Sequence, residues 1–358
     1  MFYYLVQNLF PESIFSNLLR YITARALFAA IISFVFVIWY MPKLIRGLQN
    51  RAVRQIVRDD GPKSHLAKAG TPTMGGLLML MGIAGSILFF CRWDVPQVWL
   101  ALFCLLSFGA VGFVDDWLKL TKKNTKGVSF RWKMITLGGA SLFAAYLMLH
   151  LDLIRPEITI PFFKSASASI GLWFYLWAFL VMNGTSNAVN LTDGLDGLAI
   201  VPIMTTAFVL LITSYVTGHA VFSTYLQYEH IVGAGELTVV MASMIGVGLG
   251  FLWYNAHPAS VFMGDVGSLG LGGLLGGVAL MTKKELVLML AGFLFVIEAV
   301  SVMLQVGSFK LRGKRIFKMA PLHHHFELSG WPESKVIVRF WILSILFALL
   351  ALSTLKIR

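Results

Sequence analysis

Ten long apolar runs alternate with shorter polar connections along this chain. They cover about residues 22–42, 74–91, 97–114, 134–151, 169–186, 198–217, 237–255, 267–282, 286–306 and 337–355. Each run approaches the roughly 20 apolar residues that a helix needs to cross a bilayer. The pattern therefore predicts an all-α polytopic membrane protein with about ten transmembrane helices, in which residues 1–358 form a single integral-membrane domain.

Composition agrees with this prediction. Hydrophobic residues make up 58% of the chain and charged residues 13%, about half the usual share for a soluble domain. The cysteines Cys91 and Cys104 both lie inside apolar runs, so the sequence offers neither a disulfide framework nor a zinc ribbon. The first run is longer than the core of a signal peptide and lacks a small-residue cleavage site, so we expect it to be retained.

Basic residues are concentrated in three connections, and this distribution indicates the orientation. The connections 43–73, 115–133 and 307–339 hold seven, six and seven Lys or Arg residues, which is twenty of the twenty-nine in the chain. Because connections rich in Lys and Arg stay in the cytoplasm, all three are predicted to face it. Both termini are then predicted to be periplasmic, and the connections 187–197 and 256–266 to be cytoplasmic. Nucleic-acid binding is disfavoured, because apolar runs separate the basic residues.

Small residues recur at four-residue spacing in the eighth apolar run. Ser268, Gly272 and Gly276 form one row, and Gly273 and Gly277 lie beside it. Small residues at this spacing allow two helices to approach closely in lipid, so we interpret them as a packing face.

Five aspartates at the ends of apolar runs carry the candidate chemistry, namely Asp115, Asp116, Asp193, Asp196 and Asp265. A carboxylate at the edge of the hydrocarbon is costly unless it has a partner, so such residues are functional candidates. All five are predicted to lie on the cytoplasmic side, beside most of the lysines and arginines. This arrangement suggests a divalent metal and a phosphorylated substrate.

Asp115 and Asp116 are adjacent and precede a lysine-rich connection. Neighbouring side chains on a helix point about 100° apart, so the two acids would serve different partners. One would face a metal or a lysine, and the other the acceptor. A solvated helix end is the alternative.

The segment 187–197 carries Asn187, Asn190, Asp193 and Asp196 at every third position. On a regular helix these side chains would not share a face. The two glycines in the segment therefore predict that the backbone unwinds here and folds over a ligand. An Asx-rich turn is the alternative, although four such groups are more than a turn requires.

Asp265 stands at the start of a glycine-rich run, where backbone N–H groups can receive phosphate oxygens. Alone, it would be interpreted as the N-cap of that helix. Alongside the other acidic segments it is predicted to be a metal ligand, because hard oxygen donors facing a diphosphate suit Mg²⁺.

Three consecutive histidines, His323, His324 and His325, lie between a basic stretch and the last apolar run. Successive side chains diverge on a helix or a strand, so three in a row rarely converge on one zinc ion. We expect one or two of them to donate hydrogen bonds to phosphate or sugar oxygens.

Taken together, these motifs resemble those of a known family. They are Val114-Asp115-Asp116, Asn187-x-x-Asn190-x-x-Asp193-Gly-x-Asp196-Gly, Phe262-Met-Gly-Asp265-x-Gly-Ser and Ala-Pro-Leu-His323-His324-His325-Phe-Glu. As a set, covering essentially the whole chain, they resemble the polyprenyl-phosphate N-acetylhexosamine-1-phosphate transferases. The histidine motif, together with Lys68-Ala-Gly-Thr-Pro-Thr73-Met-Gly-Gly, resembles the branch of phospho-N-acetylmuramoyl-pentapeptide transferases.

The resemblance implies a reaction, a cofactor and a location. UDP-N-acetylmuramoyl-pentapeptide and undecaprenyl phosphate would give lipid I and UMP, with Mg²⁺ as the cofactor. The enzyme would be a multi-pass protein of the bacterial cytoplasmic membrane, in contact with membrane lipid, and a homodimer.

The resemblance also assigns roles to matching positions. Asp265 would coordinate Mg²⁺, and Asp115, with Asp116 beside it, would orient or deprotonate the lipid phosphate. Further residues would bind the substrates: Asn187, Asn190 and Asp193 near the diphosphate and metal, Asp196 and Phe262 at uracil, Lys68, Thr73, Lys119 and Lys133 at phosphates or nucleotide, and His323 and His324 at the nucleotide-sugar.

Two points remain open at this stage. Glu298, in the middle of the ninth apolar run, is equally compatible with structural hydrogen bonding and with a place in a lipid groove. The transfer is either a single displacement or a double displacement through a phosphorylated aspartate. A single displacement is favoured, because a phosphate monoester with a second pKa of about 6 is already ionised and needs positioning more than activation.

Three rival functions fit the sequence less well. A sister transferase would use UDP-N-acetylglucosamine, but the histidine motif favours the muramoyl donor. A secondary transporter would place its charges near the bilayer midplane, where only Glu298 fits. A non-catalytic scaffold leaves five acids placed in this way without an explanation.

Overall fold

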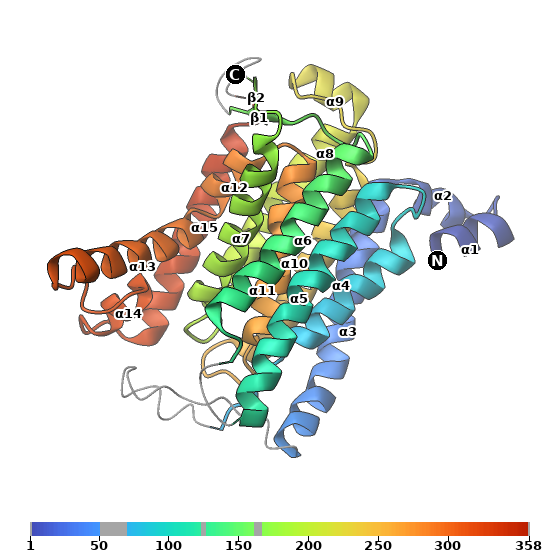
Figure 1. The fold of residues 1–358 in the computed structure, drawn as a ribbon. Helices are drawn as coiled ribbons and strands as arrows, with labels where there is room; N and C mark the ends of the chain where they lie inside the picture. The colour runs from blue at the N-terminus through green and yellow to red at the C-terminus, as the bar shows by residue number, and fades with distance from the viewer. Residues whose placement is uncertain (1, 51–69, 123–126, 161–166, 357–358) are drawn as a thin grey trace.

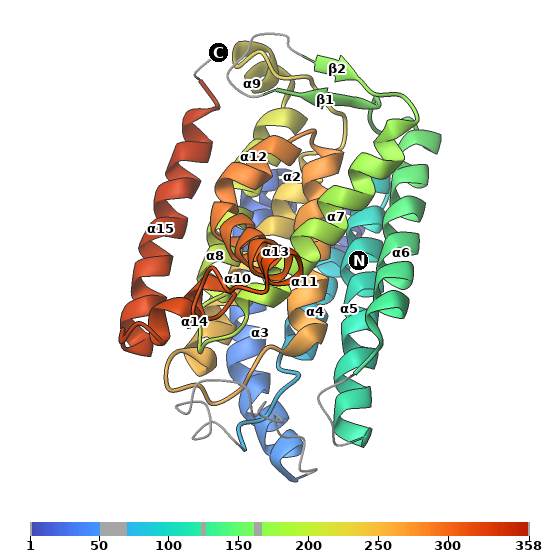
Figure 2. The same cartoon turned by 60° about the vertical axis from the view of Figure 1, so that its left-hand side comes forward.

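The computed structural model describes residues 2–50, 70–122, 127–160 and 167–356. They form an elongated helical bundle (Figures 1 and 2). The longer helices are α3 (Ile22–Asn50), α4 (Gly76–Phe90), α5 (Pro96–Lys122), α6 (Phe130–His150), α7 (Trp173–Thr192), α8 (Ile200–Gly218), α10 (Glu236–Asn255), α11 (Gly264–Met281), α13 (Phe293–Arg312) and α15 (Glu333–Ser353).

Short elements connect the long helices. They are α1 (Phe2–Leu9), α2 (Ile14–Arg20), α9 (Ala220–Tyr225), α12 (Glu285–Ala291), α14 (Leu322–Glu327) and an antiparallel hairpin of β1 (Glu157–Thr159) and β2 (Ser167–Ser169). Apart from this hairpin, the described residues contain no sheet.

The predicted all-α membrane architecture is confirmed. Among the described residues, eight helices are long and apolar enough to cross a membrane, and α4 is a shorter apolar helix. The exact number of spans, and the cytoplasmic side, stay predictions. The described chain ends lie at the end of the bundle away from Asp265. Tyr4 of α1 contacts Asp94 just before α5, and Thr354 accepts a hydrogen bond from Tyr228 beside Lys284, which follows α11.

The ninth predicted helix, 286–306, is wrong as a single helix, because it divides at Gly292 into α12 and α13. Backbone hydrogen bonds cross the break, since Gly292 donates to Leu288 and accepts from Phe295 and Val296. Glycine weakens a helix interior, so the direction can change here at little cost. As a result, α13 leaves the bundle sideways (Figure 1).

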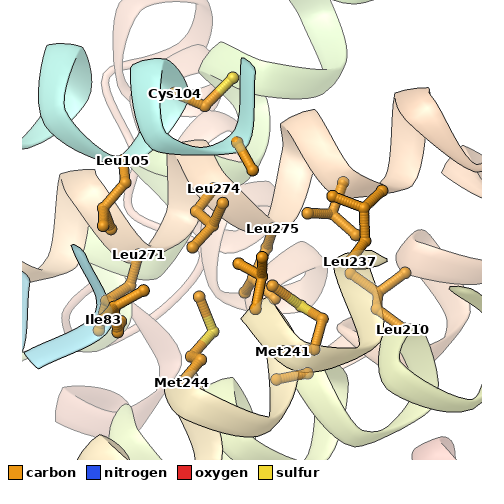
Figure 3. Packing of buried hydrophobic residues seen from close by; sticks show 14 of the residues in the cluster. Ile83, Cys104, Leu105, Leu210, Leu237, Met241, Met244, Leu271, Leu274 and Leu275 are labelled. Carbon is orange, nitrogen blue, oxygen red and sulfur yellow. The ribbon is translucent and has the colours of Figure 1, made fainter. Parts of the chain in front are cut away.

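The core is centred on α11, whose side chains are almost all buried. Helices α4, α5, α8 and α10 supply the apolar side chains that pack around it (Figure 3). A Cβ on Gly272 would lie 2.7 Å from the Cα of Ser186 in α7, and one on Gly276 would lie 3.0 Å from that of Met182. The predicted packing face is therefore confirmed. Both cysteines are free and buried, as expected.

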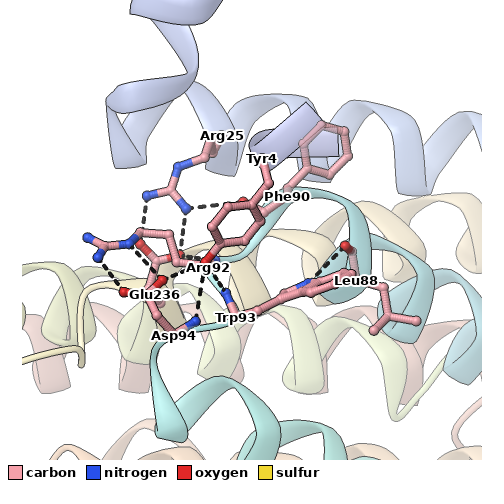
Figure 4. A network of polar contacts seen from close by, with 8 residues as sticks. All are labelled: Tyr4, Arg25, Leu88, Phe90, Arg92, Trp93, Asp94 and Glu236. Carbon is pink, nitrogen blue, oxygen red and sulfur yellow. Dashed lines mark hydrogen bonds and ion pairs between the residues drawn. The ribbon is translucent and has the colours of Figure 1, made fainter. Parts of the chain in front are cut away.

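At the end of the bundle away from Asp265, a buried ion pair joins α3 to α10. Arg25 donates to both carboxylate oxygens of Glu236, at 2.5 and 2.6 Å, and also to the Phe90 carbonyl. The N–H of Arg92 donates to the same carboxylate, and Tyr4 of α1 contacts Asp94 nearby (Figure 4). The pair thus fixes α3, α4 and α10 to one another.

Candidate active site

The closest approach of α5 to α11 places the first acidic cluster. Gly112 of α5 lies against the backbone of Asp265, and a Cβ at Gly112 would overlap the Asp265 carbonyl. Asp115 and Asp116 follow one turn later, so they come beside the Asp265 side chain. One carboxylate oxygen from each of the three residues lies within 4.8 Å of the others.

Two lysines balance part of this negative charge. The Nζ of Lys119, one turn beyond Asp115 on α5, lies 2.5 Å from Asp115 Oδ2 and 3.1 Å from Asp265 Oδ2. The Nζ of Lys133, in the first turn of α6, lies 2.9 Å from the same oxygen of Asp265. Three separate helices therefore contribute to one charged cluster, which we call the aspartate–lysine cluster (Asp115, Asp116, Lys119, Lys133 and Asp265).

Backbone N–H groups hold the carboxylates in place. Asp115 accepts from the N–H of Val128 at 2.8 Å, and Asp116 accepts from the N–H of Val266 at 3.1 Å. Gly264 reaches φ +75°, and a Cβ there would lie 2.5 Å from Asp116 Oδ2 and 3.1 Å from Oγ1 of Thr73. Thr73 therefore lies at the edge of the cluster, where the resemblance places a phosphate contact.

The segment 187–197 is only partly unwound, which corrects one prediction. Helix α7 continues to Thr192, so Asn187 and Asn190 are helical, and Asn187 donates to the Asn183 carbonyl one turn earlier. The helix continues because its backbone hydrogen bonds persist up to Asp193, whose N–H bonds the carbonyls of Val189 and Asn190. The chain unwinds only after this point.

Asp193 lies between the aspartate–lysine cluster and the next acidic residues. Burial raises its pKa to about 7, and the negative charges of Asp265, Asp116 and Asp196 add to the shift. Negative charge is therefore in excess along this edge of the protein, a condition that favours binding of a cation.

The histidine segment joins the site through Gly194. The ring of His323 is buried against this residue, so a Cβ at Gly194 would overlap the ring. Nδ1 of His323 lies 3.3 Å from Oε2 of Glu298, whereas Nε2 has no partner among the described residues. A buried ring nitrogen without a partner costs free energy, so Nε2 is a candidate to bind a substrate. His324, in contrast, contacts Glu327 at 2.8 Å.

Glu298 holds this segment in position. Its carboxylate, fully buried in α13, accepts the N–H of Leu322 at 2.8 Å and that of His323 at 3.2 Å. These are the first two N–H groups of α14, which have no partner within that helix. The open question about Glu298 is thus answered by structural hydrogen bonding to the histidine segment.

Asp196 belongs to a second group of polar side chains. Its Oδ2 lies 3.0 Å from Nδ1 of His257 and accepts the N–H of Ala259 at 3.1 Å. Glu333 accepts the N–H of Asp196 and lies 3.7 Å from His257. Asp196, His257 and Glu333 thus contact one another, and the hydrogen bonds of Asp196 fix the loop before Phe262.

Phe262 reaches the site through its backbone. It donates to the Pro72 carbonyl and accepts from the N–H of Gly75, both at 2.8 Å. This pairing brings the segment that contains Thr73 beside the segment that contains Asp265. Lys68 lies outside the described residues.

Several residues that shape this site had no role predicted from the sequence. Gly264 stands within the Phe262-Met-Gly-Asp265 motif without a role of its own, and the sequence left the role of Glu298 open. His257 and Glu333 gave no signal of their own, because their common partner, Asp196, is distant in the sequence.

The aspartate–lysine cluster has a donor set suited to a hard divalent cation. Three carboxylates offer oxygen atoms within 4.8 Å of one another. Mg²⁺ prefers carboxylate oxygens together with water and phosphate oxygens, rather than a complete protein cage. The residues therefore fit Mg²⁺ better than Zn²⁺, which prefers nitrogen and sulfur ligands.

Comparisons with known proteins converge on the same region. A model of glycosyl transferase family 4 matches residues 98–283, which run from α5 to the end of α11 and include all five aspartates. Signature 1 of the phospho-N-acetylmuramoyl-pentapeptide-transferases matches residues 68–80, which include Lys68 and Thr73.

Proposed function

Because the chain belongs to glycosyl transferase family 4, we propose that the aspartate–lysine cluster is its active site. The signature at residues 68–80 identifies the reaction as transfer of phospho-N-acetylmuramoyl-pentapeptide to a polyprenyl phosphate in peptidoglycan synthesis. The convergence of Asp115, Asp116 and Asp265 from two helices supports this assignment most directly.

The finer chemistry of the substrates is part of the proposal. The donor is UDP-N-acetylmuramoyl-pentapeptide, the acceptor is undecaprenyl phosphate, and the products are lipid I and UMP. Asp265, with Asp115 and Asp116 beside it, would hold Mg²⁺. When bound, the ion would neutralise negative charge on the diphosphate.

Each part of the site has a proposed task. Lys119 and Lys133 bind phosphate oxygens, and Thr73 and Lys68 extend this contact. Asn187, Asn190 and Asp193 line the diphosphate. Asp196 and Phe262 bind uracil. His323 and His324 contact the nucleotide-sugar, and the unpaired Nε2 of His323 supports its part in this contact.

We propose a single displacement. An oxygen of the lipid phosphate forms a bond to the sugar-linked phosphorus, and the bond from that phosphorus to the UMP oxygen breaks. Asp265 is held by Lys119 and Lys133, which makes its carboxylate a poor nucleophile. A donor with a chiral transferred phosphorus should therefore give inversion, and retention would contradict the proposal.

Release of UMP by the purified protein tests the function. We expect it to require the muramoyl donor rather than UDP-N-acetylglucosamine, and to stop when EDTA removes divalent cations. Asp265→Asn should lower the rate about 100-fold or more, as expected when a group that stabilises developing charge is lost. Asp152→Asn, at an exposed aspartate beyond α6, is the matched control and should retain activity.

Location and assembly extend the same proposal. The enzyme would lie in the bacterial cytoplasmic membrane with this site facing inwards, as a homodimer. Reporter fusions at either terminus test the orientation, and light scattering with correction for bound detergent tests the mass of the assembly.

A further inference from the structure

The end of α13 and the turn that follows it form an unusually cationic surface. We call residues 309–318 the α13 tip. Five exposed basic residues occupy it, Lys310, Arg312, Lys314, Arg315 and Lys318. Residues 299–326 contain no Asp or Glu, and within the described residues none of the first four cations forms an ion pair.

The tip has a defined backbone conformation. Oε1 of Gln305 accepts the N–H groups of Ile316 and Phe317, both at 3.0 Å, and its Nε2 donates to the Phe317 carbonyl. Ser308 donates to the Lys314 carbonyl at 2.9 Å. The turn is therefore tied back onto α13 by side chains that carry no charge.

Apolar side chains are exposed beside these cations. Leu311 is 86% exposed, Phe309 57% and Ile316 54%. Further back on the same helix, Met303 and Leu304 are also exposed. Because α13 leaves the bundle sideways (Figures 1 and 2), these side chains project away from the protein core.

In a membrane, this combination determines the depth of the tip. Exposed apolar side chains on a membrane-spanning bundle are stable in hydrocarbon, whereas unpaired ammonium and guanidinium groups are not. Long basic side chains reach the headgroup layer while their neighbours remain in the acyl region. The α13 tip therefore fits the boundary between the two.

We propose that the α13 tip is a docking surface for anionic phospholipid headgroups. The phosphate oxygens of a lipid such as phosphatidylglycerol would accept hydrogen bonds from Lys310, Arg312, Lys314 and Arg315. Phe309 and Leu311 would contact the acyl chains. An acidic soluble protein would match the charge but would leave the apolar side chains without a partner, so lipid is the occupant that satisfies both.

Lipid-selective quenching tests the proposal on the full-length enzyme. Leu311→Cys provides a site for a bimane fluorophore, because the native Cys91 and Cys104 are fully buried. The labelled protein is placed in phosphatidylcholine nanodiscs that contain the same fraction of either brominated phosphatidylglycerol or brominated phosphatidylcholine. Since each basic residue near an anionic leaflet contributes about fivefold in partitioning, quenching by the anionic lipid should be at least about threefold stronger.

Two paired substitutions make the test specific. Lys314→Gln with Arg315→Gln should bring quenching by the two lipids close to equality. The matched control, Lys43→Gln with Lys122→Gln, removes two exposed cations elsewhere on the protein and should leave the preference unchanged. High salt should also weaken the preference in the protein with the native tip, because exposed charges are screened.

Three results would overturn the proposal. They are equal quenching by both lipids with the native tip, a preference that survives loss of Lys314 and Arg315, and no quenching by either lipid, which would place the tip in water. Release of UMP in detergent, compared between the tip variant and its parent, verifies folding, because the tip has no part in the proposed chemistry.

Discussion

Replacing Glu298 by glutamine tests whether this buried carboxylate positions the histidine segment. In the native protein both carboxylate oxygens accept backbone N–H groups, those of Leu322 and His323. Glutamine has almost the same size but only one acceptor oxygen. Its amide group would face the second N–H, so that one donor of α14 would lose its partner in a buried environment.

The expected loss of free energy in Glu298→Gln follows from these two hydrogen bonds. A hydrogen bond to a charged group contributes about 1.5–3 kcal/mol, and an unsatisfied buried donor costs about 1–3 kcal/mol. Losing one bond and weakening the other would therefore destabilise the docked histidine segment by roughly 2–4 kcal/mol. If turnover requires His323 in its docked position, this loss of free energy decreases turnover about 30-fold to 1000-fold.

The assay is UMP release, with kcat and KM determined separately for each substrate. Glu285→Gln is the matched control, because Glu285 is equally buried and lies in the adjoining helix α12. We expect the control to retain its turnover. Glu298→Ala, which removes both acceptors, should be at least as impaired as Glu298→Gln.

Equal turnover in the Glu298→Gln and Glu285→Gln proteins would refute this reasoning. The position of His323 would then not depend on Glu298. A lower thermal stability of Glu298→Gln with unchanged kcat would assign the residue a structural role alone.

Four further predictions follow from other contacts. Gly264→Ala should lower the rate of UMP release about tenfold or more, because Gly264 has φ +75° and the added Cβ would lie 2.5 Å from Asp116 Oδ2. Unchanged activity would show that Asp116 can move freely. Arg25→Met should destabilise the protein by about 3–5 kcal/mol in denaturant unfolding, since it leaves Glu236 buried without its main partner, while Arg92→Met, at an exposed pair, should cost far less. Burial raises the pKa of the Glu285 carboxyl group to about 7. The folded protein therefore binds the carboxyl proton more tightly than the unfolded chain, and stability is lost as the pH rises through 7. Glu285→Gln should raise the melting temperature at about pH 8 and have little effect near pH 4. Lys133→Gln should tighten Mn²⁺ binding about tenfold in electron paramagnetic resonance titrations while lowering turnover, because it removes a cation from Asp265. Unchanged Mn²⁺ affinity would show that Lys133 does not compete with the metal for the Asp265 carboxylate.

Hydropathy predicted the helices well where length and apolar character decide the structure. The run 198–217 corresponds to α8 (Ile200–Gly218), and 237–255 to α10 (Glu236–Asn255). The same criterion failed at 286–306, because the bend at Gly292 depends on the different packing of α12 and α13. One glycine within an apolar run gives too weak a signal to predict such a break.

The candidate site was predictable as a set of residues but not as a set of contacts. Adjacency singled out Asp115 and Asp116, and its place at the start of a glycine-rich run singled out Asp265, because acids are rare in this chain. The pairing of Asp265 with Lys133 could not be predicted, since it depends on how α6 packs against α5 and α7. The role of Glu298 could not be predicted for a related reason, because it binds backbone N–H groups, which every residue except proline possesses.

The contacts of the aspartate–lysine cluster imply that it is assembled by the fold rather than by a metal. Carboxylates this close repel one another unless positive charge or N–H donors offset them. Lys119 and Lys133 supply two positive charges, and the N–H groups of Val128 and Val266 supply the donors. Because both lysines reach the same oxygen of Asp265, a cation that binds there competes with them for this oxygen. If the proposed metal site is correct, a lysine displaced in this way would be available to contact a phosphate of the substrate.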